Sequence, residues 1–367
     1  MTETAATLDN LTLARKEGWQ KFVNTPARVP PEALNRDELD RLTDKERTDY
    51  DRERREWHAN LGPLKTRQLV EVHENLWDVI DSNAQDGDKP KGAVAIDAVP
   101  GLGKTTAVLS FARAFHRREV AENGTTTEEG HERWPVCRVG LTGNTGLREF
   151  NRAMLAFYAH PGGRRGNAAD FAHRALDCVL ACETKILIVD DLHFLRLQST
   201  SGVEVSNHFK YIANEFPLTV IFAGVGLEAR GLFSEGSSDR DALLAQTGRR
   251  TTRLTMDPFG VTNDAGRRAW RQTLKAIEQR VVLAEKYPGM IADDLSDYLY
   301  ARCTGQIGSL MTLINRGCQR AVRTGYERLD EELLDRVKID EASEKAREEL
   351  RLAFDNGCLR TRIGRAG

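Results

Sequence analysis

The chain lacks the features that mark membrane, secreted and strongly basic proteins. No apolar run approaches the roughly 18 residues that a membrane-spanning helix needs. The first residues, Met1-Thr-Glu-Thr-Ala-Ala, lack the basic and apolar regions of a signal peptide. A formal net charge of −2 and a pI near 6.5 exclude a global positive field, so any nucleic-acid contact must come from a local patch. We expect a cytoplasmic protein with no membrane partner.

Cysteine is scarce, with 6 residues scattered over 367. Cys178 and Cys182 lie four positions apart in a predicted helix and could in principle hold a metal ion. No second pair and no histidine accompanies them at ligand spacing, so the pattern favours buried, reduced thiols.

The length is enough for a substantial core and more than one folding unit. Residues 1–60 are polar, interrupted by prolines and dense in both charge signs, which is typical of an exposed helix or a partner-binding arm. Its aromatic residues, among them Trp19 and Trp57, could anchor it onto something larger. Residues 64–82 have the apolar spacing of an amphipathic helix.

From Gly92 the pattern alternates between strands and helices, which predicts an α/β fold with a parallel sheet covered on both faces. The expected strands are 93–99, 135–141, 185–190, 218–223 and 252–256. The expected helices between them are 104–121, 146–158, 168–182 and 204–215. Beyond residue 262 the signals are helical only, with helices expected at 262–286, 291–303, 306–323 and 330–352.

A phosphate-binding motif lies between the first strand and the helix that follows it. Residues 98–106 read Ala-Val-Pro-Gly-Leu-Gly-Lys-Thr-Thr, a Walker A pattern with Ala98 where the pattern has glycine. Its glycines would let backbone N–H groups face an anion, Lys104 would reach the β- and γ-phosphates, and Thr105 would hold Mg²⁺. The alternative is a glycine-rich turn that binds nothing. The residues predicted to contact ATP are Pro100, Gly101, Leu102, Gly103, Lys104, Thr105 and Thr106.

A Walker B pattern follows at a suitable distance. Ile186-Leu-Ile-Val-Asp190-Asp191 is an apolar strand that ends in two carboxylates. Asp190 would join Thr105 in holding Mg²⁺, because hard cations prefer oxygen ligands. Asp191 would orient or deprotonate the attacking water. An acidic turn with no catalytic role is the alternative.

Two arginines, Arg249 and Arg250, precede the fifth strand. In a ring or filament, an arginine there can reach the γ-phosphate of a neighbouring subunit and offset charge in the transition state. A solvated basic turn explains the pair equally well.

Together these residues resemble the TniB/TnsC group of AAA+ ATPases of bacterial transposition. The resemblance spans about residues 60–340. It includes both Walker motifs, Gly224 at the end of the fourth strand, and the arginines before the fifth. The part that separates this group from other P-loop proteins is Thr304-Gly305-Gln-Ile-Gly308-Ser-Leu310 with the helix after it, and Trp57-His-Ala-Asn-Leu-Gly-Pro-Leu64 also resembles TniB-type proteins.

The resemblance implies a P-loop AAA+ sheet with flanking helices, a C-terminal helical lid and an N-terminal helical arm. The expected ranges are 1–60 for the arm, 61–258 for the nucleotide-binding core, 259–345 for the lid and 346–367 for a tail. It also implies a homo-oligomeric ring or filament on duplex DNA that recruits or activates a transposase or integrase. Asp191 stands where the family usually has glutamate, Val225 where it commonly has threonine, and Gly308 where many AAA+ proteins have arginine, so we expect slow ATP hydrolysis.

DNA contact is expected after the second strand, in the region where relatives approach the duplex backbone. The candidate residues there are Asn144, Arg148, Arg164 and Arg165, and an ordinary solvated arginine surface is the alternative. Two other functions compete with the transposition ATPase. One is a P-loop switch in signalling or defence that binds no DNA. The other is a small-molecule kinase, which is disfavoured because the second Walker B carboxylate suits water activation.

Overall fold

The computed structural model describes residues 11–86, 89, 91–142, 145–192, 208–209, 211–213, 215–227 and 250–362. The chain forms two compact units, which are described one at a time. Unit 1 comprises Met1–Pro26, Glu71–Pro100 and Lys104–Met256, and unit 2 comprises Ala27–Val70, Gly101–Gly103 and Asp257–Gly367.

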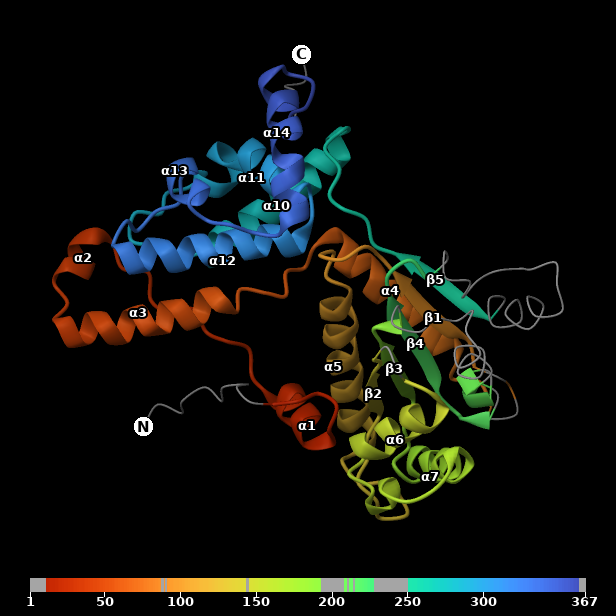
Figure 1. The fold of residues 1–367 in the computed structure, drawn as a ribbon. Coiled ribbons are helices and arrows are strands. Elements are labelled where there is room, and N and C mark those ends of the chain that lie inside the picture. Colours follow the sequence, from red (N-terminus) through yellow and green to blue (C-terminus); the bar gives the residue numbers. More distant parts are fainter. Residues whose placement is uncertain are drawn as a thin grey trace. The chain divides into compact units, whose positions relative to one another are not determined.

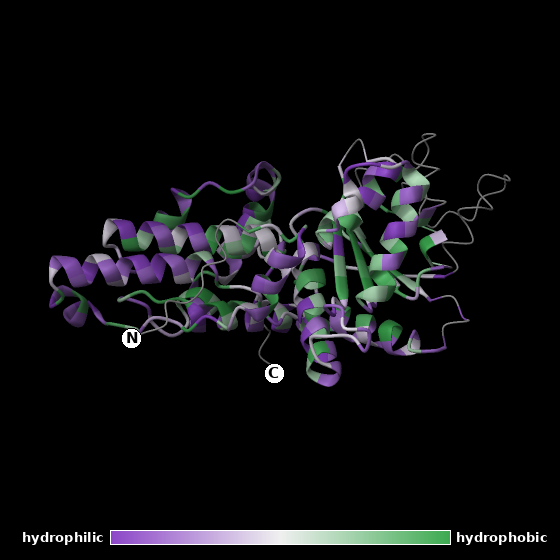
Figure 2. Ribbon diagram, turned by 90° about the horizontal axis from the view of Figure 1, so that it is seen from below, coloured by the Kyte–Doolittle hydropathy of each residue, from purple (hydrophilic) through white to green (hydrophobic). Residues whose placement is uncertain are grey.

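Unit 1 is built on a five-stranded parallel sheet with the order β2-β3-β4-β1-β5 (Figure 1). The strands β1, β3 and β4 are buried along their whole length. Most of the sheet is accordingly at the hydrophobic end of the scale in Figure 2. Continuous apolar strands are what a parallel sheet covered by helices requires. The strands are β1 (Ala93–Asp97), β2 (Val136–Gly140), β3 (Ile186–Asp190), β4 (Thr219–Gly224) and β5 (Thr251–Thr255).

Helices surround this sheet and connect its strands. The longest, α5 (Lys104–Asn123), contacts β3 and β4 and buries Phe111 and Phe115. Helices α6 (Leu147–Phe157) and α7 (Ala168–Ala181) pack against each other, and α7 begins with a capping box formed by Asn167 and Asp170. The remaining helical elements of unit 1 are α1 (Lys16–Asn24), most of α4 (Arg67–Ser82) and η1 (Pro161–Gly163).

The first helix, α1, is packed onto α5 rather than exposed. Trp19 is 0% exposed and its Nε1 donates to His116 Nδ1 at 3.2 Å. At the other end of α1, the Arg117 guanidinium donates to the carbonyls of Val23 and Thr25 at 2.8 and 3.0 Å. Trp19, which the sequence suggested as an anchor, is thus buried together with Gly18 and Val23, and the polar residues of α1 lie around them.

Unit 2 is helical. Its core gathers around Trp270, Leu310, Leu313 and Ile314, which are all fully buried. Two of its helices, α3 and α12, contact each other along their length (Figure 1). The elements are α2 (Arg36–Asp40), α3 (Asp44–Ala59), α10 (Asp264–Arg280), the π-helix η3 (Met290–Asp294), α11 (Ser296–Cys303), α12 (Ile307–Thr324), α13 (Glu331–Asp335) and α14 (Glu341–Asp355).

Two helices predicted from the sequence end or break earlier than expected. The helix predicted over 330–352 is divided into α13 and α14, because Val337 turns inward and the Asp340 side chain caps α14 by accepting from the Ser343 N–H at 2.9 Å. The helix predicted over 262–286 ends at Arg280, since the next residues are extended and the Val282 N–H donates to His58 Nε2 at 3.0 Å.

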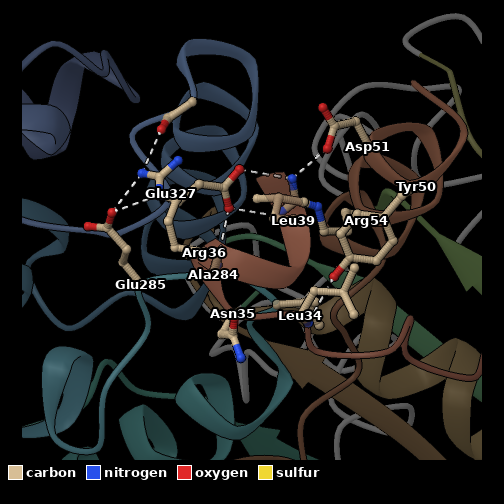
Figure 3. Close-up of polar contacts among 12 residues, drawn as sticks. Leu34, Asn35, Arg36, Leu39, Tyr50, Asp51, Arg54, Ala284, Glu285 and Glu327 are labelled. Carbon is tan, nitrogen blue, oxygen red and sulfur yellow. Dashed lines mark hydrogen bonds and ion pairs between the residues drawn. The ribbon is translucent and has the colours of Figure 1, made fainter. Parts of the chain in front are cut away.

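A buried ion pair fastens α3 into unit 2 (Figure 3). The Arg54 and Glu327 side chains are both 0% exposed, and Arg54 Nη1 donates to Glu327 Oε2 at 2.6 Å. Glu327 also accepts from the Ala284 N–H at 3.1 Å, and Arg54 contacts Asp51 as well. Residues that looked like a solvated charged helix therefore supply a desolvated ion pair.

The compact units do not follow the ranges expected from the sequence. Residues 27–60, expected in a separate arm, group with the helices that follow residue 257. Helix α14, most of it expected in a tail, belongs to the same unit. The chain order hides this grouping because the contacts that create it join residues more than 200 positions apart, such as Arg54 and Glu327.

All six cysteines are free thiols, and only Cys358 is exposed. Burial raises the pKa of Cys178 to about 12 and that of Cys182 to about 11, so both stay protonated at neutral pH. The described residues contain no group of three or more potential metal ligands. Among the same residues, no helix has the length and apolar character needed to cross a membrane.

Candidate nucleotide-binding site

The loop between β1 and α5 has the backbone shape of an anion-binding loop. Gly101 and Gly103 have φ values of 84° and 83°, a region that a Cβ atom disfavours. The loop leads directly into the first turn of the 20-residue helix α5, whose unpaired N–H groups favour a bound phosphate. Among the other residues predicted to contact the nucleotide, Leu102 is buried, and the exposed ones are Pro100, Thr105 and Thr106.

Lys104 is half-buried beside the ends of the strands. Its Nζ donates to the carbonyls of Ala98 and Val99 at 2.7 and 3.2 Å. Burial lowers the pKa of Lys104, and the negative charges of Asp97, Asp190 and Asp191 act in the opposite direction. The Lys104 ammonium group therefore lies at the carboxyl edge of the sheet, close enough to three carboxylates for their negative charge to act on its pKa.

The two Walker B carboxylates have different surroundings. Asp190 is buried and its Oδ2 accepts from Arg138 Nη2 at 2.6 Å, while its Oδ1 accepts from the Asp191 N–H at 3.0 Å. Asp191 is only partly buried and has a φ of 60°, a left-handed conformation that aspartate tolerates better than most residues. The first carboxylate is thus fixed, and the second lies just beyond the strand end.

Three residues of this edge were missed by sequence reasoning. Asp97 ends β1 directly before the loop, is 8% exposed and lies 3.5 Å from Arg253 of β5. Arg138 of β2 neutralises Asp190 across the strand pair. The signal that could have found Asp97 and Arg138 is a charged residue inside an otherwise apolar strand.

Strand order brings Asp97 and Asp190 together. β4 lies between β1 and β3, with Asp97 in register with Gly224 and Val189 in register with Phe222. Because the carboxyl ends of parallel strands lie at one edge, both carboxylates flank the end of β4. Gly224 presents no side chain between them. Val225, which follows it, brings no hydroxyl group to this edge.

Arg250 lies at the opposite edge of the sheet. It directly precedes β5, and its carbonyl accepts from the N–H of Ala93, the first residue of β1. Ala93 and Asp97 are four positions apart along β1, which corresponds to about 13 Å of extended chain. The Arg250 backbone is therefore remote from the phosphate loop of its own sheet. Arg249 lies outside the described residues.

The candidate DNA-binding arginines lie on α6 and on the turn before α7. Arg148, Arg164 and Arg165 are exposed. Arg148 Nε donates to the Gly166 carbonyl at 3.3 Å, so Arg148 lies beside the turn that carries Arg164 and Arg165. Arg174 Nη1 fixes the turn by donating to the carbonyls of residues 162 and 165, each at 2.8 Å. The fourth candidate, Asn144, lies outside the described residues.

The residues of the carboxyl edge fit a magnesium–nucleotide complex. The glycine loop and the start of α5 offer N–H donors to phosphate, and Lys104 adds a cation. Thr105 and Asp190 offer the oxygen ligands that Mg²⁺ prefers. A buried donor, Arg138 Nε, has no hydrogen-bond partner within the described part of the chain. These groups would bind the phosphates and hold the cation.

Comparison with known proteins supports this interpretation of the fold. Residues 87–233 match the family model of an AAA domain, a range that contains the phosphate loop and both Walker B carboxylates. No curated protein matches the chain by sequence.

Solved structures give the wider architecture. The ORC1 protein of Aeropyrum pernix in complex with DNA is 13% identical, with a TM-score of 0.55 over 82% of this chain and 70% of that one. The Aeropyrum pernix ORC2 protein, in ADPNP and ADP complexes, is 14% identical with a TM-score of 0.54 over 81% and 71%. Cdc6p from Pyrobaculum aerophilum is 12% identical with a TM-score of 0.50 over 82% and 84%.

At these identities the likeness concerns the fold. It covers 81–82% of this chain, which is more than the range of the family match. The fold class expected from the sequence, a P-loop AAA+ sheet with flanking helices and a helical C-terminal region, is confirmed. Residues 87–233 therefore resemble an AAA domain, and the fold of the chain is similar to those of the Aeropyrum pernix ORC1 protein and Cdc6p.

Proposed function

We propose that this protein is an ATP-binding and slowly ATP-hydrolysing regulator of DNA transposition, which assembles on duplex DNA and recruits or activates a transposase. The observation that carries the nucleotide part is the position of Lys104, with Asp97, Asp190 and Asp191 around it at the end of a parallel sheet. The transposition part rests on the TniB-like residues around Thr304–Leu310 and Trp57–Leu64.

Each residue of the edge has a role in this proposal. Bound Mg²⁺ would supply Lewis-acid polarisation of the phosphate oxygens. Lys104 would exchange its two carbonyl contacts for phosphate oxygens, and Thr105 and Asp190 would hold the cation. Asp191 would orient the attacking water, with a side chain one methylene shorter than the glutamate of relatives. The shorter reach supports slow turnover.

Assembly would use the other edge of the sheet. Since Arg250 is remote from the phosphate loop of its own chain, a role on the γ-phosphate requires a neighbouring subunit. ATP held between two subunits would favour the assembled state, and loss of the γ-phosphate would remove that preference. Arg148, Arg164 and Arg165 are the proposed contacts with the duplex backbone.

One observation favours the alternative, a P-loop switch that binds no DNA. Arg148 donates to the Gly166 carbonyl and its guanidinium lies 5.5 Å from the centre of the Phe171 ring, so a structural role accounts for it. Arg164 and Arg165 have no such contacts among the described residues, and the DNA hypothesis depends chiefly on them.

The test is ATP hydrolysis by the full-length protein with and without duplex DNA, alongside electron microscopy with a non-hydrolysable ATP analogue. We expect DNA to stimulate hydrolysis and the analogue to produce rings or filaments on DNA. The Lys104→Ala variant is the control and should do neither. ATPase activity that is indifferent to DNA, with no assembly, would support the alternative.

A further inference from the structure

The outer face of α12 carries a row of arginines in unit 2. Arg316, Arg320 and Arg323 are spaced by four and three residues, which places them on one face of the helix. Along the axis, Arg316 and Arg320 are about 6 Å apart and Arg316 and Arg323 about 10 Å. The opposite face of α12 is buried in the core of the unit.

Two of these arginines fix a second cationic segment beside the helix. Arg316 Nη1 donates to the Lys338 carbonyl at 2.5 Å, and Arg320 Nη1 donates to the Arg336 carbonyl at 2.7 Å. The turn between α13 and α14 is thereby held against α12, with both of its cationic side chains exposed. We call the resulting set the α12 basic surface, and it consists of Arg316, Arg320, Arg323, Arg336 and Lys338.

Little negative charge offsets this surface. Within the described residues, carboxylates form no ion pair with Arg316, Arg320, Arg323 or Lys338, and the one salt bridge in the set is Arg336–Glu332 at 2.6 Å. That pair is largely exposed on both sides, so it is weak and can be exchanged for another anion. Four of the five cations of this surface are therefore not neutralised by an ion pair within the described part of the chain.

From this arrangement we infer that the α12 basic surface binds the phosphate backbone of duplex DNA. Guanidinium groups pair with phosphates through their planar N–H forks, and each keeps donors free after one contact to a carbonyl. The residues of α12 beside the row are Thr312, Gln319 and Thr324, which are polar. A protein partner would need a buried aromatic or aliphatic anchor, and this face offers none among the described residues.

This inference rests on the proposed function and extends it, because it adds a phosphate-binding surface on unit 2 to the arginines of unit 1. Phosphate contacts of this kind give affinity without sequence choice. Their signature is salt dependence, since each neutralised phosphate releases condensed counterions.

The test compares two full-length triple variants with the same loss of charge. The first variant replaces three of the five cations of the α12 basic surface, with Arg316→Gln, Arg323→Gln and Lys338→Gln. The control, with Lys45→Gln, Arg52→Gln and Lys345→Gln, removes three exposed cations of the same unit outside it. Binding of a fluorescent duplex is measured by anisotropy at several salt concentrations, and circular dichroism checks the fold.

We expect the first variant to bind duplexes of any sequence more weakly. The slope of log affinity against log salt should become shallower by about 0.9 for each lost contact, or about 3 for three. A third variant, Arg316→Lys with Arg323→Lys, keeps the charge and should retain the slope, which separates electrostatics from a structural role. The charge-matched control should retain it as well.

Three outcomes overturn the inference. If the first variant and the control have the same affinity and slope, the DNA surface lies elsewhere, although the proposed function survives. If the first variant loses binding to polyglutamate but not to DNA, the surface serves an acidic protein. Should the wild-type protein bind no duplex at all, the proposed function fails together with this inference.

Discussion

The buried pair Arg54–Glu327 gives the sharpest prediction about stability. Replacing Glu327 by glutamine keeps the size of the side chain and removes its charge. Among the described residues, the 0% exposed side chain of Arg54 then keeps Asp51 as its one counter-charge (Figure 3). Breaking a buried pair in this way costs about 3–5 kcal/mol. Because Asp51 remains, and glutamine can still accept from the Ala284 N–H, we expect a loss near the lower end, about 3 kcal/mol.

The measurement is urea unfolding followed by tryptophan fluorescence, since Trp57 and Trp270 both lie in unit 2. The matched control is Glu332→Gln, which makes the same substitution in an ion pair whose side chains are 62% and 75% exposed. An exposed pair contributes under about 1 kcal/mol. Equal, small losses in the two variants would refute the reasoning, because they would mean that water reaches Arg54 and Glu327.

Three further predictions concern the nucleotide site, assembly, and the pH dependence of the stability of unit 1. Lys104→Ala should abolish ATP binding, whereas Asp191→Asn should permit binding and block hydrolysis, because asparagine tolerates the same left-handed backbone. Binding of a fluorescent nucleotide and release of phosphate distinguish the two variants. Wild-type turnover in both variants would show that these residues do not belong to the site. Arg250→Ala should leave nucleotide binding by isolated subunits intact but abolish ATP-dependent assembly, and unchanged assembly in light scattering would exclude a role between subunits. Burial lowers the pKa of His116 from 6.5 to about 4, so its contribution to the stability of unit 1 should be complete above pH 6.5 and fall by up to about 3 kcal/mol as the pH decreases to 4. Unfolding followed by Trp19 fluorescence at several pH values measures this, and a free energy of unfolding that does not change between pH 6.5 and pH 4 would contradict it.

Each strand and the phosphate loop could be predicted because a short, continuous stretch of the sequence defines it. Each buried parallel strand is an apolar run, and the loop lies between one such strand and a helix. Strand positions from the pattern and from the structure agree to within a residue or two. The site assignments themselves, including Lys104, Asp190 and Asp191, remain predictions that mutation must test.

The remainder depends on contacts that the sequence pattern does not encode. Arg138 and Asp190 form an ion pair because β2 and β3 are neighbours in the sheet, so the sequence around either residue does not indicate its partner. In the sequence, Glu327 is one charged residue among several on a polar turn, and only the fold shows that it is buried against Arg54. Hydrophobic periodicity predicts which elements form, but ion pairs between elements follow from topology.

The anchoring of the N-terminal residues bears on how the protein can be shortened for experiments. A fragment that begins after residue 60 would retain every residue of both Walker motifs. It would also lack Trp19, leaving an uncovered site on α5, and lack Arg54, leaving Glu327 as a buried carboxylate without its main counter-charge. Inactivity or aggregation of such a fragment would therefore report on its folding and not on its capacity to use ATP.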